Sequence, residues 1–317
     1  MEGEATRLLR FGLTITAFGF VIMGCGGSSS FPNPTSSAPV PTASPTPSPA
    51  PSASPAAEAS RIEVVDGVSG AATGSGQFGV GAGPLQSFTS AFDATPKGAD
   101  LTVIVPGYLR RTTSLPSSGR VNLWPAANAT EEEYVRRIVF INAVDNATER
   151  GLFRLPFGTF RVSLASEVDT PESRAALGRV FARLNDATRG AITLSLTVGT
   201  QLATLSVDPS ITPFGGFTNW NSTGGYITTG TVRLVSASRA TSESLLLHEF
   251  GHLIGLQHSD RSEDVMNSAA RTLEFTTRER SVVAMMFQRS AGMRFPDSDL
   301  GTTLRSATDS RAYSCGR

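Results

Sequence analysis

The chain has 317 residues, of which 39% are hydrophobic, and its 27 lysine and arginine side chains balance 27 acidic ones for a formal net charge of +0. This length and composition allow a substantial buried core in one or two domains and exclude a chain that is disordered throughout. The neutral charge balance does not favour a polyanionic partner, so we expect no nucleic-acid binding.

Residues 1–24 have the pattern of a secretory signal peptide. Two arginines precede an apolar run at residues 11–23, which is too short for a comfortable membrane span and suits the hydrophobic part of an export signal. The segment Ile22-Met23-Gly24-Cys25 then resembles a bacterial lipobox, which implies acylation of Cys25 and an exported lipoprotein anchored in a membrane of the cell envelope. The alternatives are a plain signal peptide, which would give a secreted protein, and an uncleaved anchor with an incidental cysteine.

Residues 25–58 are mostly Gly, Ser, Pro, Ala and Thr. This composition cannot bury a core and favours extended, polyproline-like conformations. We therefore expect a tether between the lipid anchor and a folded head. The chain has 2 cysteines, so acylation of Cys25 leaves Cys315 without a partner and predicts a fold without disulfides.

The first folded segment is a predicted small, all-β module over residues 59–125. Its β-type runs are separated by clusters of Gly, Pro and Ser, and they lie at residues 61–65, 87–92, 101–105, 108–115 and 120–124. The module is either a prodomain that is removed on activation or a permanent domain, and the sequence leaves both open.

Residues 126–317 form the second predicted domain, which mixes strands and helices. Thr130 is the predicted cap of a short helix that runs to Arg137. Pro171 begins a longer helix that ends near Gly190, because apolar residues follow it at helical spacing. The other predicted elements are strands at 160–165, 192–198, 202–207 and 226–235, helices that begin within 241–244 and over 276–289, and a surface loop at 214–225 that contains Trp220. This order predicts an α+β fold with helices covering a mixed sheet.

The most informative motif contains every histidine in the chain: His248, His252 and His258. At about 3.6 residues per turn, His248 and His252 project from one helix face, one turn apart, so both imidazoles can bind one ion. Glu249 lies about 100° around the helix from His248, where it can reach a water on that ion as a general base. Gly255 lets the chain leave the helix with a positive φ and return His258 to the ion. Three imidazoles with an open fourth position predict one catalytic Zn²⁺ ion.

The pattern His-Glu-x-x-His-x-x-Gly-x-x-His at residues 248–258 resembles that of the metzincin zinc metallopeptidases, and its spacing is most similar to the matrixin branch. The resemblance covers roughly residues 155–295 and is strong from 245 to 266. It implies a zincin-like, mixed twisted sheet with an active-site helix and a C-terminal helix. It also implies a methionine-containing turn in which Met266 forms a hydrophobic floor under the zinc ligands.

The chain departs from related peptidases at two places. Asn267 and Ser268 follow Met266, so the tyrosine that assists astacin-type enzymes is absent. No cysteine lies between Cys25 and Cys315, which excludes the upstream cysteine that keeps matrixins latent. We interpret Cys315 as an inert terminal thiol, with a capping role at the zinc as the alternative.

Two short polar segments, one directly after His258 and one near the C-terminus, have a second interpretation. Ser259 and Asp260 are turn residues or, alternatively, orient a zinc ligand. Residues 296–299 read Pro-Asp-Ser-Asp, which suggests structural Ca²⁺, but the remaining ligands of a known calcium loop are missing. We therefore interpret residues 296–299 as a solvated turn.

These features together predict a zinc-dependent endopeptidase that hydrolyses peptide bonds of extracellular or envelope proteins. Glu249 would take a proton from the attacking water and pass it to the leaving amine. An extended peptide substrate would pair with an exposed sheet edge, which we place between Leu205 and Thr228. One alternative is a non-catalytic or weakly active zinc-containing envelope binding or adhesion lipoprotein, and another is a zinc amidase that cuts non-peptide amides. The oligomeric state and the cleavage preference stay open.

Overall fold

The structure is a computed structural model and describes residues 59–95, 98–141, 148–269, 272–299 and 308–315. All of these residues belong to one compact unit, Pro55–Arg317. The predicted signal peptide, the lipobox with Cys25 and the tether lie outside the described residues. Within the described ranges, no helix is both long enough and apolar enough to cross a membrane.

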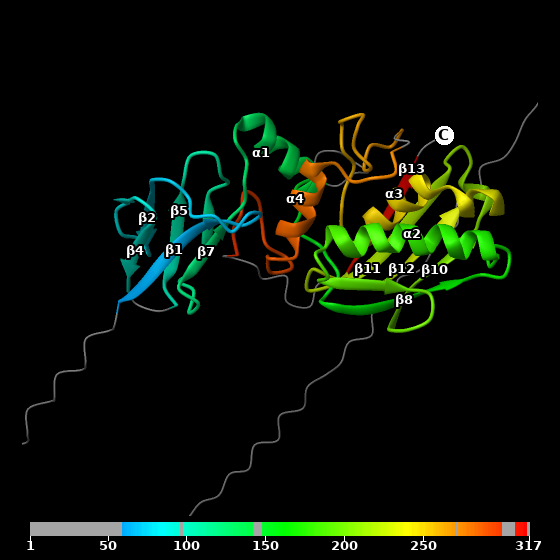
Figure 1. Cartoon of the computed structure of the whole chain (residues 1–317), viewed down its shortest axis with the longest axis horizontal. Helices are drawn as coiled ribbons and strands as arrows, with labels where there is room; N and C mark the ends of the chain where they lie inside the picture. The colour runs from blue at the N-terminus through cyan, green and yellow to red at the C-terminus, as the bar shows by residue number, and fades with distance from the viewer. Residues whose placement is uncertain (1–58, 96–97, 142–147, 270–271, 300–307, 316–317) are drawn as a thin grey trace, which may run out of the picture. The chain divides into compact units, whose positions relative to one another are not determined.

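Seven short strands at the start of the described chain form two small sheets (Figure 1). The strand orders are β4-β1-β7 and β3-β2-β5-β6. The sheets share an apolar core, in which the rings of Phe78 and Phe92 stack with centroids 3.8 Å apart. The sequence did not predict β2, because two of its five residues are glycines. The strands are β1 (Ser60–Asp66), β2 (Gly76–Val80), β3 (Gln86–Phe88), β4 (Ala91–Ala94), β5 (Asp100–Ile104), β6 (Arg111–Ser114) and β7 (Arg120–Leu123).

A six-stranded sheet with the order β13-β11-β12-β10-β8-β9 follows in the rest of the chain. β12, β10, β8 and β9 run parallel to one another, whereas β11 runs antiparallel to both β12 and β13. The sheet is therefore mixed, as the sequence predicts. Its strands are β8 (Gly158–Leu164), β9 (Ile192–Ser195), β10 (Thr200–Val207), β11 (Gly216–Thr223), β12 (Tyr226–Leu234) and β13 (Thr308–Cys315).

The surface loop predicted at residues 214–225 is wrong, because β11 lies there. Alternate residues of this strand are buried: Gly216, Thr218, Trp220 and Ser222. Three of these four are glycine, threonine or serine, so the inward face lacks the apolar alternation by which a half-buried strand is recognised. The low apolar content of this segment is therefore the reason that the sequence did not predict a strand here.

The helices at Pro171–Ala187 (α2) and Glu243–Leu253 (α3) pack against this sheet, and the helices begin where the sequence offers caps. Thr170 caps α2 by accepting a hydrogen bond from the N–H of Ser173 at 3.2 Å. The predicted cap Thr130 is wrong for α1, because Asn128 takes that role and accepts from the N–H groups of Thr130 and Glu131. Asparagine is at least as strong a cap as threonine. The described α-helices are α1 (Ala129–Val135), α2 (Pro171–Ala187), α3 (Glu243–Leu253) and α4 (Thr277–Met286).

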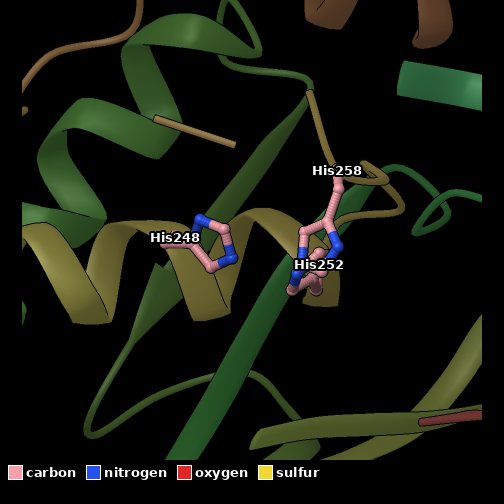
Figure 2. A group of neighbouring side chains, drawn as sticks. All are labelled: His248, His252 and His258. Atoms are coloured by element: carbon pink, nitrogen blue, oxygen red, sulfur yellow. The ribbon is translucent and has the colours of Figure 1, made fainter. Parts of the chain in front are cut away.

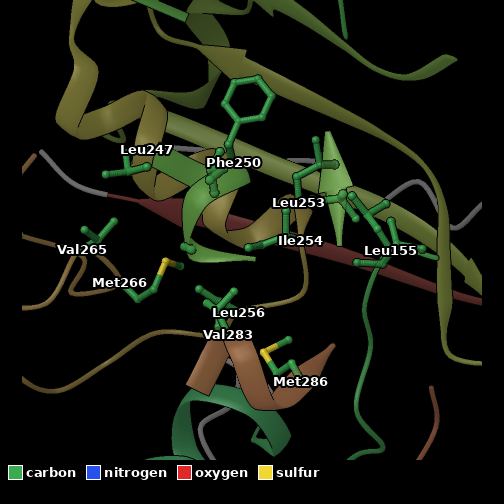
Figure 3. Close-up of a cluster of buried hydrophobic side chains, with 14 of the residues drawn as sticks. Leu155, Leu247, Phe250, Leu253, Ile254, Leu256, Val265, Met266, Val283 and Met286 are labelled. Carbon is green, nitrogen blue, oxygen red and sulfur yellow. The ribbon is translucent and has the colours of Figure 1, made fainter. Parts of the chain in front are cut away.

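The main core holds α3 at the centre of this part of the protein. Its last two turns are buried on all sides, and Phe250 meets Phe181 of α2 edge to face with ring centroids 5.1 Å apart. Leu256, Met266 and Met286 gather in the same apolar cluster (Figure 3). The position of α3 is therefore fixed by contacts from several elements, which is a requirement for a precise site on this helix.

The turn at residues 296–299 is not solvated, contrary to the prediction. Asp297 is 0% exposed, and its carboxylate accepts hydrogen bonds from Nε of Arg289 at 2.7 Å and from Nη2 at 2.8 Å. Nη1 of Arg111 donates to Oδ1 of Asp297 at 3.0 Å, and Arg111 also contacts Asp299. Two guanidinium groups compensate the buried charge, so this cluster is an ion-pair network and does not have the donor set of a calcium site.

Candidate metal centre

Helix α3 supplies two of the three histidines, and the loop after it supplies the third. His248 and His252 lie on the buried part of the helix. The helix ends at Leu253, and Gly255 follows with a φ of +112°. This conformation is strained for any residue with a side chain, and it turns the chain so that His258 approaches the other two histidines.

The three imidazoles converge on one place (Figure 2). One ring nitrogen from each of His248, His252 and His258 lies within 4.8 Å of the other two. The ring centroids are 4.8 Å apart for both pairs that include His252, and 5.4 Å apart for His248 and His258. Three nitrogen donors this close together match the ligand set of one zinc ion.

Backbone carbonyl groups orient the two helix histidines. Nδ1 of His248 lies 2.7 Å from the carbonyl oxygen of Val265, and Nδ1 of His252 lies 2.8 Å from that of Leu256. Because a carbonyl oxygen only accepts, each Nδ1 carries the hydrogen and donates it. The lone pair of each neutral ring is therefore on Nε2, which is the arrangement that metal-binding histidines use.

The surroundings keep all three imidazoles uncharged. Burial, together with the nearby His258, lowers the pKa of His248 to about 3. Burial also lowers the pKa of His258 to about 4 and holds that of His252 well below its ordinary value. Only a neutral imidazole offers a lone pair to a metal, so these rings are in the ligand form at neutral pH.

Glu249 is the carboxylate beside the histidines, and β11 lies against it. The side chain is 0% exposed, and the hydroxyl of Thr218 donates to its Oε2 at 2.6 Å. An ideal Cβ built on Gly216 would lie only 2.3 Å from Oε1 of Glu249. The absence of a side chain at Gly216 therefore gives this carboxylate its room. Sequence reasoning missed both β11 residues, because it placed them in a loop.

Met266 packs against α3 at Gly251. The N–H of Ser259 donates to the carbonyl oxygen of Met266 at 2.9 Å, which ties the chain after His258 to the methionine turn. Met266 is 0% exposed, and an ideal Cβ on Gly251 would lie 2.4 Å from its sulfur. Gly251 therefore admits Met266 against the helix, although the motif pattern treats this position as variable.

A buried polar network supports this turn from below. The hydroxyls of Ser259 and Tyr134 donate to Oδ2 of Asp264 at 2.6 and 2.8 Å, and that of Thr276 donates to Oδ1 at 2.9 Å. The N–H of Met266 donates to Oε1 of Glu279 at 3.0 Å. Ser259 thus ties the chain after His258 to Asp264. Asp264, Tyr134 and Glu279 were missed, because their partners are far apart in the sequence.

Ionisation of Glu279 will weaken the fold. Burial raises the pKa of this carboxyl to about 7, from an ordinary value of 4.5, a difference that corresponds to about 3 kcal/mol. The pKa of Glu279 is higher in the folded state than in the unfolded state. The stabilisation that the neutral carboxyl provides is therefore complete below pH 4.5 and is lost as the pH rises through 7. The difference in the free energy of unfolding, wild type minus Glu279→Gln, should therefore decrease as the pH rises from about 5 to about 8.

Urea unfolding of both metal-free proteins at several pH values measures this difference. Subtraction of the Glu279→Gln values removes the contribution of every other titrating group. Parallel pH profiles for the two proteins would contradict the prediction, whatever the absolute cost of the substitution.

Comparisons with known proteins address the segment that carries the site. Residues 197–285 match the matrixin peptidase family model. The matched segment contains the three histidines, Glu249, Gly255 and Met266, and it extends into α4. It covers less than half of the chain, and it supports a metallopeptidase with a metzincin-like site.

No curated protein matches the chain. Two solved structures of the GH20 exo-β-N-acetylglucosaminidase from Vibrio harveyi are similar to it at 8% identity. One comparison covers 63% of this chain and 34% of that enzyme with a TM-score of 0.23, and the other covers 60% and 33% with a TM-score of 0.24. The chain thus spans about a third of those enzymes, and scores this low carry no argument about fold or function.

Proposed function

We propose that this protein is a zinc-dependent endopeptidase of the metzincin type. The observation that carries the proposal is the convergence of three neutral imidazoles, two of them buried and that of His258 half-buried, beside the buried carboxylate of Glu249. His248, His252 and His258 would hold the zinc ion through ring nitrogens. Bound zinc supplies a Lewis acid that polarises a carbonyl group and makes a water more acidic.

The residues of the chain have separate tasks in this reaction. The carboxylate of Glu249 takes a proton from the attacking water and passes it to the amine that leaves. The hydroxyl of Thr218, 2.6 Å from Oε2 of Glu249, holds the carboxylate in one orientation. Burial excludes bulk water from Glu249 and thereby strengthens its interactions with charged groups. Met266 and the network around Asp264 fix the turn below the ligands.

The proposed substrates are extracellular or envelope proteins. This assignment follows from the pattern of an export signal, a lipobox at Cys25 and a tether over residues 25–58. Acylation of Cys25 would hold the protein at a membrane while the tether lets the folded part reach its substrates. Mass spectrometry of the mature N-terminus tests the lipid anchor, and an unmodified cysteine there would contradict it.

Metal removal tests the proposed peptidase. The purified full chain should contain one zinc ion, and dialysis against a chelator should abolish cleavage of an unstructured fluorescent peptide. Added Zn²⁺ should restore both the metal content and the cleavage. A His252→Ala protein provides the control, because it should neither retain zinc nor recover activity. Cleavage that persists without metal would contradict the proposal, and a zinc-loaded chain without hydrolysis would favour the binding lipoprotein.

A further inference from the structure

β13, the last described strand, covers the edge of the main sheet (Figure 1). It pairs with all eight residues of β11 in antiparallel register, from Thr308 opposite Thr223 to Cys315 opposite Gly216. The other side of β11 is paired with β12. Both edges of β11 at which an extended peptide could form backbone hydrogen bonds are therefore occupied by neighbouring strands.

β11 is also the strand that touches the proposed general base. Thr218 donates to Glu249, and the backbone at Gly216 approaches the same carboxylate so closely that it leaves no room for a Cβ. A peptide that added to the outer side of β11 would therefore run past Glu249. Adding a strand to a sheet edge is a common way for a protein to bind an extended peptide.

This arrangement corrects one prediction about the substrate edge. The exposed edge was expected between Leu205 and Thr228, and β11 does lie within that range. The outer side of β11 is not exposed, however, because β13 pairs along its whole length. The place where a substrate strand would bind is thus filled by a strand of the same chain.

We propose that β13 is an internal substrate mimic that keeps the full chain in a state of low activity. The inference rests on the proposed peptidase function. A tethered strand competes at an effective concentration on the order of millimolar, so it lowers the apparent affinity for substrate without abolishing turnover. Because β13 is the edge strand, its release leaves the order β11-β12-β10-β8-β9 intact and opens β11 to a peptide.

The test is a full-length chain with the double substitution Arg311→Pro/Ala312→Pro. The N–H groups of neighbouring residues in a strand point to opposite sides. One of the two prolines must therefore remove a hydrogen bond to β11, and both prolines restrict the backbone. The matched control, Arg311→Ala/Ala312→Ser, changes the same two side chains but keeps both N–H groups.

Release of β13 should raise kcat/KM by about tenfold or more, mainly through a lower KM, in the proline variant and not in its control. Hydrogen exchange of the β11 amides should accelerate in the same variant. An unchanged KM together with unchanged exchange would overturn the proposal. The Cys315→Ser protein should stay as slow as the wild type, and a gain equal to that of the proline variant would also overturn it, because the block would then depend on the thiol.

A binding measurement separates this proposal from the peptidase function itself. In the Glu249→Ala background, a labelled peptide with the sequence of residues 308–315 should bind the proline variant at least tenfold more tightly than the unsubstituted chain. Equal binding to both would overturn the strand mimic. Selective binding without hydrolysis in any chain that retains Glu249 would support the mimic and contradict the peptidase.

Discussion

Replacement of Glu249 by alanine will lower peptide hydrolysis by roughly 10²–10⁴-fold, the range expected for loss of a positioned general base. The zinc content should stay at one ion per chain, because His248, His252 and His258 remain. The loss should appear in kcat more than in KM, since in the proposed reaction the carboxylate acts on the reacting water and not on distant parts of the substrate. Steady-state kinetics and elemental analysis of the same preparation measure both quantities.

A matched control for this experiment is Glu172→Ala. Glu172 lies in the first turn of α2 and is exposed, so its replacement should leave both hydrolysis and zinc content unchanged. Retained proteolysis in Glu249→Ala would remove Glu249 from the mechanism. Loss of zinc in that protein would instead make Glu249 part of the metal site.

Gly255→Ala should destabilise the protein and weaken zinc binding together. Its φ of +112° costs an alanine about 1–3 kcal/mol, and an ideal Cβ there would lie 2.0 Å from the carbonyl oxygen of Phe153. That contact is with backbone, so the chain after α3 must move and carry His258 with it. Thermal unfolding and competition with a chelator should show a lower Tm and a weaker affinity for zinc.

Gly178→Ala is the matched control for that substitution. Gly178 is exposed on α2, and an ideal Cβ there meets no atom within 4 Å. Replacement of a helical glycine by alanine should raise stability by about 1 kcal/mol. A Gly255→Ala protein with wild-type Tm and zinc affinity would show that the turn after α3 does not depend on this glycine.

The elements that sequence reasoning predicted well are those specified locally. α2 has a cap, α2 and α3 both have apolar residues at helical spacing, and the motif at residues 248–258 places two ligands on one helix face by geometry alone. The family match over residues 197–285 supports the same interpretation. Predictions failed for segments whose structure depends on contacts with residues distant in the sequence. β11 has a polar inward face, and Asp297 is buried only because Arg289 and Arg111 reach it.

The buried polar residues that hold the methionine turn in place could not be predicted from the sequence either. Glu279 is indistinguishable in sequence from an ordinary capping-box residue, and it does cap α4 with Thr276. Its bond to the N–H of Met266 exists only because α4 packs under the methionine turn. The motif therefore predicts the ligands and the general base, whereas the residues that hold them require the tertiary structure.

The glycines at positions 216 and 251 have a practical consequence for the transfer of this site to another protein. A methyl group at Gly216 would push on the carboxylate of Glu249, and one at Gly251 would push on the sulfur of Met266. Both atoms lie at the ends of flexible side chains, so the fold could absorb either change by moving the groups that the chemistry needs. A design that grafts residues 248–258 onto another scaffold must therefore place a glycine on the strand opposite Glu249, as Gly216 is here. It must also retain Gly251 in the helix.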